Sequence, residues 1–344
     1  HDPIYEGFHP DLEKVLLARI AYDSFEQDQL FFLKDDIVRR IGEFLADTLD
    51  APKHLDGAAV LEAIERQQGI LVERATGIYS FSHLTLQEYL TAFHIVEARL
   101  EADVIKQHLI DERWREVFLL MSGLSGNRAI DMLERLHCQS QTYEQGYAKL
   151  GRLLHWASAS TANTQGTYAP LAKRAAALAI AIASDSDSVS VSIDSDSIST
   201  SIDSAIARAS DIAIASDSDS NIAIAININI ARTRGRTRGS DRAFKNIFGN
   251  RKFADLPKQL KRLSDRVPDE KATSDAWQAW ADELEALWLD ALGLDHADLI
   301  FNQEEAEALH NYLYATELLI RCKDAAVRIP KQKWAELEAR LLTV

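Results

Sequence analysis

Several residue types and patterns are scarce in this sequence, and each scarcity excludes a class of protein. Cysteine occurs only at Cys138 and Cys322, outside any CxxC or Cys/His spacing, which argues against a disulfide framework and a structural zinc site. No run approaches the roughly 20 uncharged apolar residues that cross a bilayer. The chain begins at His1 without an initiator methionine or signal peptide, so we expect a segment of a longer cytoplasmic polypeptide, with no membrane partner.

Catalytic and nucleotide-binding motifs are also missing. The sequence contains no Gly-x-x-x-x-Gly-Lys-Ser/Thr loop, no Gly-x-Ser-x-Gly elbow and no His-Glu-x-x-His helix. We therefore assign no catalytic residue and no metal ligand. The net charge of −15 repels a phosphate backbone, so any nucleic-acid contact would have to be local.

What is present in the first hundred residues is an ordered series of helical patterns. Apolar residues at helical spacing predict helices from Asp11, with Asp11 as N-cap, from about Asp35 to Leu49, and from about Asp56 to Gln68. Gly69 ends the third helix. Three helices followed by a hairpin are the order of a winged helix, which we expect over residues 1–100.

The hairpin and the helix behind it complete this domain. Two β-prone runs, 70–74 and 78–81, flank a glycine-containing turn. Directly afterwards Thr85 and Glu88 have the spacing of a capping box, ahead of a long apolar stripe that predicts a closing helix.

The remainder predicts helices, interrupted by a segment of unusual composition. Residues 101–174 continue the helical pattern, whereas 175–240 reduce to Ala, Ile, Ser, Asp and Asn in dipeptide alternation. Period two favours a strand, but alanine does not, so helix, strand and disorder all remain open. The fold class is therefore mainly α: a winged-helix domain with a small β-hairpin, then an all-α region interrupted by this low-complexity repeat.

Residues 241–344 return to ordinary complexity and predict a C-terminal helical domain. We expect Ser274 to cap a helix that Gly293 ends, and Asn302 with Glu305 to form a capping pair. A last helix follows Pro330. The tryptophans recur at helical spacing, which favours packing between helices over ligand stacking.

One constellation carries functional information. Residues 79–93 read Tyr-Ser-Phe-Ser-His-Leu-Thr-Leu-Gln-Glu-Tyr-Leu-Thr-Ala-Phe, directly after the expected wing. This run resembles the Phe-x-His-Leu-x-x-Gln-Glu-Tyr-Leu signature that closes the winged-helix domain of NACHT NTPases, at unchanged spacing. Residues 16–22 and 114–120 resemble neighbouring helices of that family, and 311–320 with 334–338 are similar to C-terminal helical domains of bacterial NACHT proteins.

The resemblance implies a role for His83. In that family the histidine of the signature contacts the β-phosphate of ADP bound by the neighbouring NTPase domain and holds the protein closed. An imidazole beside helix-N-terminal N–H groups suits such an anion. The implied cofactors are ADP or ATP with Mg²⁺, held by an upstream NACHT domain and not by this segment alone. The implied partners are that domain, an unidentified trigger such as a phage protein in bacterial antiphage defence, and further copies of the protein on activation.

Two alternatives concern nucleic acids. A winged helix can read DNA, but the expected recognition helix offers Asp56, Glu62 and Glu65 against Arg66, Gln67 and Gln68, and acidic residues would meet phosphates. An RNA-binding role could use the Arg/Gly run 232–239 together with Arg242, Lys245, Arg251 and Lys252, with Phe244 and Phe248 as aromatics. We favour a solvated basic linker for that run.

Overall fold

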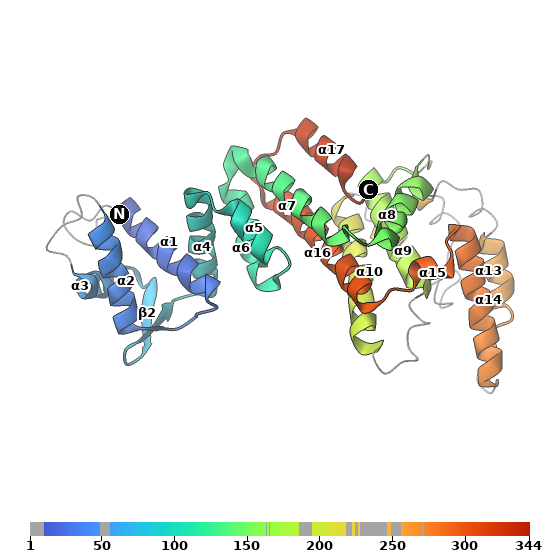
Figure 1. Cartoon of the computed structure of the whole chain (residues 1–344), viewed down its shortest axis with the longest axis horizontal. Helices are drawn as coiled ribbons and strands as arrows, with labels where there is room; N and C mark the ends of the chain where they lie inside the picture. Colours follow the sequence, from blue (N-terminus) through green and yellow to red (C-terminus); the bar gives the residue numbers. More distant parts are fainter. Residues whose placement is uncertain are drawn as a thin grey trace. The chain divides into compact units, whose positions relative to one another are not determined.

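The computed structural model describes residues 10–48, 56–162, 164, 166–185, 195–217, 222–223, 226–227, 246–248, 256–269 and 272–344 (Figure 1). Over these residues the protein is mainly α-helical with a small antiparallel sheet, which confirms the expected fold class. The chain divides into two compact units. Unit 1 is His1–Met132 with Ala325–Arg328, and unit 2 is Leu133–Asp324 with Ile329–Val344. The finer division at residues 100, 174 and 240 stays a prediction.

Unit 1 begins with the three predicted helices, α1 (Pro10–Glu26), α2 (Lys34–Asp47) and α3 (Gly57–Gln68). Their apolar stripes meet in one core that includes Leu16, Leu17, Ile20, Ile37, Ile41, Val60, Leu61 and Ile64. The expected N-cap at Asp11 is wrong, because α1 already includes Pro10. Asp11 lies in the first turn instead, where a carboxylate favours the helix dipole.

Helix α3 has well-defined ends. The Asp56 carboxylate accepts a hydrogen bond from the Ala59 N–H at 2.7 Å, and Gly69 ends the helix in the left-handed conformation with φ of +61°. At the first helical residue, Gly57, an added Cβ would lie 2.2 Å from the Val38 carbonyl oxygen. Only glycine therefore allows α3 to approach α2 this closely.

The sheet contains three strands in the order β1-β3-β2 over the described residues. The predicted hairpin forms β2 (Leu71–Ala75) and β3 (Ile78–Phe81), joined through Gly77 at φ of +73°. Strand β1 (Phe32–Leu33) pairs with β3 and was not predicted, because two residues are too short to show an alternating pattern.

Helix α4 (Leu84–Ala98) follows β3 and packs against α1. It begins one residue before Thr85, with His83 at the N-cap, so the predicted Thr85–Glu88 capping box is wrong. Glu88 lies too far into the helix to reach the cap, and its side chain is buried instead.

Further helices continue unit 1 and lead out of it, as the sequence predicted. They are α5 (Glu101–His108), the 3₁₀ turn η1 (Glu112–Trp114), α6 (Arg115–Leu124), the 3₁₀ turn η2 (Gly126–Arg128) and α7 (Ala129–Glu144). Trp114 is fully buried and contacts Phe25 edge-on at a centroid distance of 4.9 Å.

In unit 2 the described part of the low-complexity segment is helical. Helix α8 (Ala148–Thr161) and helix α10 (Ser195–Ala215) both pack against α9 (Pro170–Asp185). Every residue from Leu171 to Ala183 of α9 is buried, including Lys173 and Arg174. From Ala175 to Ala183 the helix is apolar on all sides, as is typical of a helix inside a core. On α10 the buried residues recur at spacings of three and four: Ile202, Ala205, Ile206, Ala209, Ile212 and Ala213.

The C-terminal helices are α13 (Leu256–Ser264), α14 (Ser274–Leu292), α15 (His296–Leu299), α16 (Gln303–Ala325) and α17 (Lys331–Arg340). Thr273, and not the predicted Ser274, caps α14, while Gly293 ends it as expected. Asn302 and Glu305 form the predicted reciprocal cap, with N–H to side-chain oxygen distances of 3.0 and 2.9 Å.

Some single side chains also bear on the sequence predictions. Trp288 is fully buried, but Trp277 is 39% exposed, so the packing role expected for the tryptophans is wrong at that position. Both cysteines are free, Cys138 exposed on α7 and Cys322 buried in α16.

Candidate functional site

The candidate site lies at the N-terminus of α4, where the sequence placed His83. This residue has extended backbone angles (φ −138°, ψ 143°) and its carbonyl accepts hydrogen bonds from Leu86 N–H and Gln87 N–H at 3.1 and 3.4 Å. Its side chain is exposed and makes no hydrogen bond with any described residue. The His83 imidazole is therefore available to a ligand or a neighbouring domain.

The backbone beside His83 favours an anion. Within the described part of the chain, no residue accepts a hydrogen bond from the N–H groups of Leu84 or Thr85, as is usual in the first turn of a helix. The positive end of the helix dipole lies at the same place. A phosphate here could accept from the imidazole and from backbone donors together.

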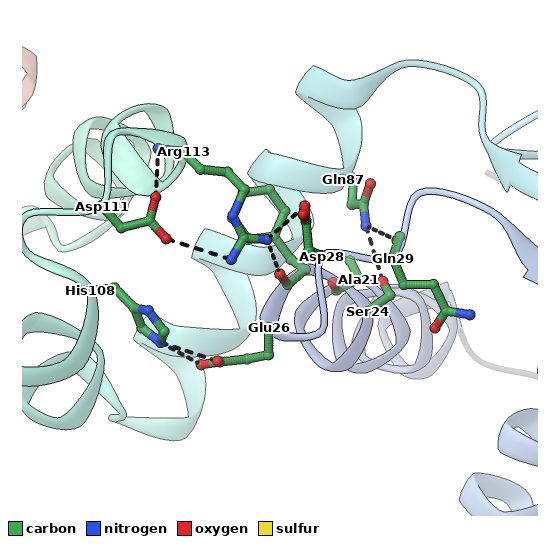
Figure 2. Close-up of polar contacts among 10 residues, drawn as sticks. Ala21, Ser24, Glu26, Asp28, Gln29, Gln87, His108, Asp111 and Arg113 are labelled. Carbon is green, nitrogen blue, oxygen red and sulfur yellow. Dashed lines mark hydrogen bonds and ion pairs between the residues drawn. The ribbon is translucent and has the colours of Figure 1, made fainter.

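Other residues of the signature hold α4 in place. Phe81 packs edge-on against Phe32 in the core, and Leu90 is 4% exposed. The buried Gln87 side chain donates from Nε2 to Ser24 Oγ at 3.0 Å and to the Gln29 carbonyl at 3.3 Å (Figure 2). These bonds fix the first turns of α4 against the end of α1, so His83 projects from a rigid support.

Tyr89 and Glu88, also in the signature, have different surroundings. Lys14 Nζ donates to the Tyr89 hydroxyl at 3.3 Å and lies 3.8 Å from the centroid of the Phe93 ring. Burial, and secondarily the charge of Glu116, raises the pKa of Glu88 above its ordinary value. Nothing in the sequence pattern indicated this environment, because Glu116 is far along the chain.

A polar network on the other side of α1 joins its last turn to η1 and α5 (Figure 2). Arg113 donates to the Phe25 carbonyl at 2.6 Å and lies 3.2 Å from the Asp28 carboxylate. His108 Nε2 lies 3.1 Å from a Glu26 carboxylate oxygen, and its ring stacks on Trp114 at 4.1 Å. Sequence reasoning missed this network, since its partners are more than 80 residues apart.

The two alternatives from the sequence were DNA binding by the third helix and RNA binding by the Arg/Gly run. On the exposed side of α3, Arg66 pairs with Glu62 at 2.6 Å, so its charge is locally compensated. Whether α3 contacts DNA stays a prediction. The Arg/Gly run 232–239, with Arg242, Phe244, Lys245, Arg251 and Lys252, lies outside the described residues, although Phe248 is described and buried.

The described residues contain neither a candidate metal site nor a candidate membrane-spanning helix. There, no group of three or more His, Cys, Asp or Glu side chains has the arrangement of a metal site. No described helix has the length and apolar character needed to span a membrane.

The comparisons with known proteins agree with the fold. A family model described as the winged helix-turn-helix domain C-terminal to NACHT matches residues 18–95, which include His83. A second model, the NACHT C-terminal helical domain 2, matches residues 256–344. No curated protein and no solved structure matches the chain. The two matches lie at the two ends of the chain and support a C-terminal NACHT region, with a winged-helix domain followed by a C-terminal helical domain.

Proposed function

We propose that this chain is the regulatory and sensor half of a NACHT NTPase switch, in which the winged helix latches an ADP-bound off state. The matched domains follow a NACHT domain, which implies an NTPase domain upstream in the same protein. The observation that carries the proposal is the exposed imidazole of His83, held at a helix N-terminus beside unoccupied N–H donors.

The chemistry assigned to His83 is recognition of phosphate. Its imidazole donates a hydrogen bond to the β-phosphate of ADP held by the NTPase domain, and the α4 dipole adds to the attraction. ADP with Mg²⁺ is thus bound in the upstream domain and contacted from this one. Couplings of this kind amount to about 1–3 kcal/mol, or roughly 5- to 150-fold in an equilibrium constant.

The latch is a two-state element. Contact with ADP favours the closed state, and a trigger sensed by the C-terminal helices favours the open state, from which copies of the protein assemble. By the family resemblance we propose a phage protein as the trigger and antiphage defence in bacteria as the role. Cells that express the intact gene should then form fewer phage plaques than cells without it, and equal plaque counts would remove this part of the proposal.

The test of the latch uses the intact protein loaded with a fluorescent ADP. His83→Ala should speed ADP release by roughly 5- to 150-fold, the range expected for losing the coupling. The matched control is His155→Ala, which removes an exposed histidine from α8 and should leave the release rate unchanged.

His83→Asn separates a latch from a structural cap. Asparagine is a good N-cap residue, so it preserves or strengthens the helix end. Its shorter side chain does not extend as far as imidazole, so ADP release should still accelerate. Wild-type release from both His83→Ala and His83→Asn would overturn the proposed role of His83.

A further inference from the structure

A cavity of about 350 Å³ opens beside the N-terminus of α4, within unit 1. Phe25, Leu30 and Leu84 form much of its apolar wall, while Glu88 and Glu116 contribute carboxylates. A volume of this size accommodates a large side chain or a small ligand. Its position next to His83 makes the contents of this cavity relevant to the latch.

The Glu88 carboxylate is the unusual group of the cavity. Glu88 is only 9% exposed, yet it makes no hydrogen bond or ion pair with any described residue. Glu116, at the exposed edge of the cavity, likewise has no described cation partner. Two arginines also line the cavity, and both are engaged. Arg113 is bonded to the Phe25 carbonyl and paired with Asp28, and Arg115 has an interaction of its own.

A buried Glu88 carboxylate beside Glu116, without a paired cation, is energetically unfavourable. Burial and the neighbouring charge of Glu116 both disfavour ionised Glu88 and raise its pKa. A buried carboxylate is ordinarily paired with a cation or fully hydrogen-bonded. The cavity therefore has the charge and the space for a cation that comes from outside the described residues.

Exposed apolar side chains adjoin the same cavity. Leu30 and Leu84, which line it, are 47% and 52% exposed. Phe31 and Leu33 follow at 60% and 61%, and Ile78, the cross-strand partner of Leu33, is 37% exposed. We name these five residues the apolar edge. Exposed apolar side chains beside the cavity favour a protein contact over a free small amine.

Geometry connects the apolar edge to His83. Residues 83 and 84 are consecutive, so their Cα atoms are about 3.8 Å apart. A domain that brings a nucleotide to the His83 imidazole therefore comes within reach of Leu84, which lines the cavity.

We propose that the upstream NACHT domain inserts one arginine or lysine side chain into this cavity, where its cation pairs with Glu88 and Glu116 while apolar residues beside it pack on the apolar edge. This inference rests on the proposed latch, because it takes the latch's partner as the source of the cation. It adds a charge-specific anchor to the closed state. Removing one partner of a buried interfacial ion pair typically costs a factor of about thirty or more in affinity.

The test is carboxylate footprinting of the intact, ADP-bound protein with a water-soluble carbodiimide and an amine, read by mass spectrometry. Glu88 and Glu116 should be labelled at least about tenfold more slowly than in the same intact protein stripped of nucleotide, in which contact with ADP no longer favours the closed state. In Glu88→Gln, Glu116 should lose this protection, because the inserted cation then lacks its buried partner.

Control variants keep the result interpretable. Glu97→Gln removes an exposed carboxylate from the same helix and should leave Glu116 protected. Glu116→Gln alters an exposed position that does not support the fold, and it should deprotect Glu88 if Glu88→Gln proves unstable. Unprotected wild-type carboxylates, or protection of Glu116 that persists in Glu88→Gln, would overturn the inference.

ADP release, measured on the same samples, separates this inference from the latch. Fast release from His83→Ala with unprotected wild-type carboxylates supports the latch and refutes the cation anchor. Unchanged release from His83→Ala, with protection that depends on Glu88, refutes the phosphate contact and keeps the anchor.

Discussion

The core of unit 1 and the part of unit 2 around α9 and α10 have different amino-acid compositions. In unit 1 the buried residues vary in size and shape, from Ala18 to Phe32 and Trp114. In unit 2 helices α9 and α10 bury almost nothing but alanine, isoleucine and leucine. Both sets of residues are buried, so burial alone does not require side chains of varied size and shape. What differs is how each packing is made specific.

In unit 1 shape and aromatic contacts provide much of the specificity. Phe32 meets Phe81 at an interplanar angle of 88°, and Phe25 meets Trp114 at 89°. Such edge-to-face contacts allow few alternative arrangements.

Around α9 and α10, hydrogen bonds and an ion pair of long basic side chains provide the specificity instead. Arg174 donates to the Glu338 carbonyl at 3.0 Å, Lys173 to the Gly166 carbonyl at 2.8 Å, and Arg208 pairs with Glu317 at 2.6 Å. A repeat of small residues can thus be aligned by a few anchors at its sides.

The largest expected effect tests the aromatic core. Trp114→Ala should lower the free energy of unfolding of unit 1 by about 3–5 kcal/mol, because it removes a fully buried indole from between Phe25 and His108. Urea unfolding followed by circular dichroism measures this. Trp277→Ala, at an exposed position, is the control and should change little.

A second experiment compares the two cores directly. Ala177→Leu in α9 and Ala92→Leu in α4 each add bulk at a fully buried position and should each cost about 1–3 kcal/mol in urea unfolding. A neutral Ala177→Leu together with a costly Ala92→Leu would show that the alanine-rich core yields more easily than the aromatic one. Ile214→Leu, at an exposed site on α10, provides the baseline.

Helix caps give a smaller effect in each unit. Asp56→Ala and Asn302→Ala should each destabilise by about 1 kcal/mol, because each removes an acceptor for a first-turn N–H. The reciprocal bond runs from the Asn302 backbone N–H to the Glu305 carboxylate and remains in Asn302→Ala, so the two losses should be similar. No loss of unfolding free energy in urea for either variant would show that its cap contributes nothing.

The smallest effect is a pH dependence in unit 2. Burial, and then the charge of Arg340, lowers the pKa of His137 from its ordinary value of 6.5, although Glu134 opposes this. The folded state then binds the proton more weakly than the unfolded state, so stability is complete above pH 6.5 and falls on acidification below it. His137→Gln should reduce this slope, whereas His155→Gln, at an exposed site, should leave it unchanged.

The sequence predicted those features that depend on local spacing. Helices α2 and α3, the hairpin and the Asn302–Glu305 cap are set by residues within a turn or two of one another. The N-terminal ends of α1, α4 and α14 were each misplaced by one or two residues, and for α14 the adjacent Thr273 and Ser274 were equally good capping candidates. Strand β1 has no local signal, and the helical structure of the described part of the repeat depends on packing that no local rule describes.

The candidate site divides in the same way. His83 was found because it belongs to a compact signature. The burial of Glu88 beside Glu116 and the hydrogen bonds of Gln87 to the end of α1 depend on distant contacts, as the 63-residue separation of Gln87 from Ser24 illustrates. Sequence spacing identifies the exposed ligand contact, whereas only the fold reveals its support.

Unit 2 contains one exposed thiol, Cys138, and one fully buried thiol, Cys322 in α16. The difference in accessibility allows the rate of local opening to be measured. A thiol reagent applied in a short pulse attaches at once to the outer sulfur, and so records the amount of protein in the sample. Attachment to the inner sulfur requires α16 to separate from its neighbours. The ratio of the two products would time that opening in the unaltered polypeptide, without any engineered probe.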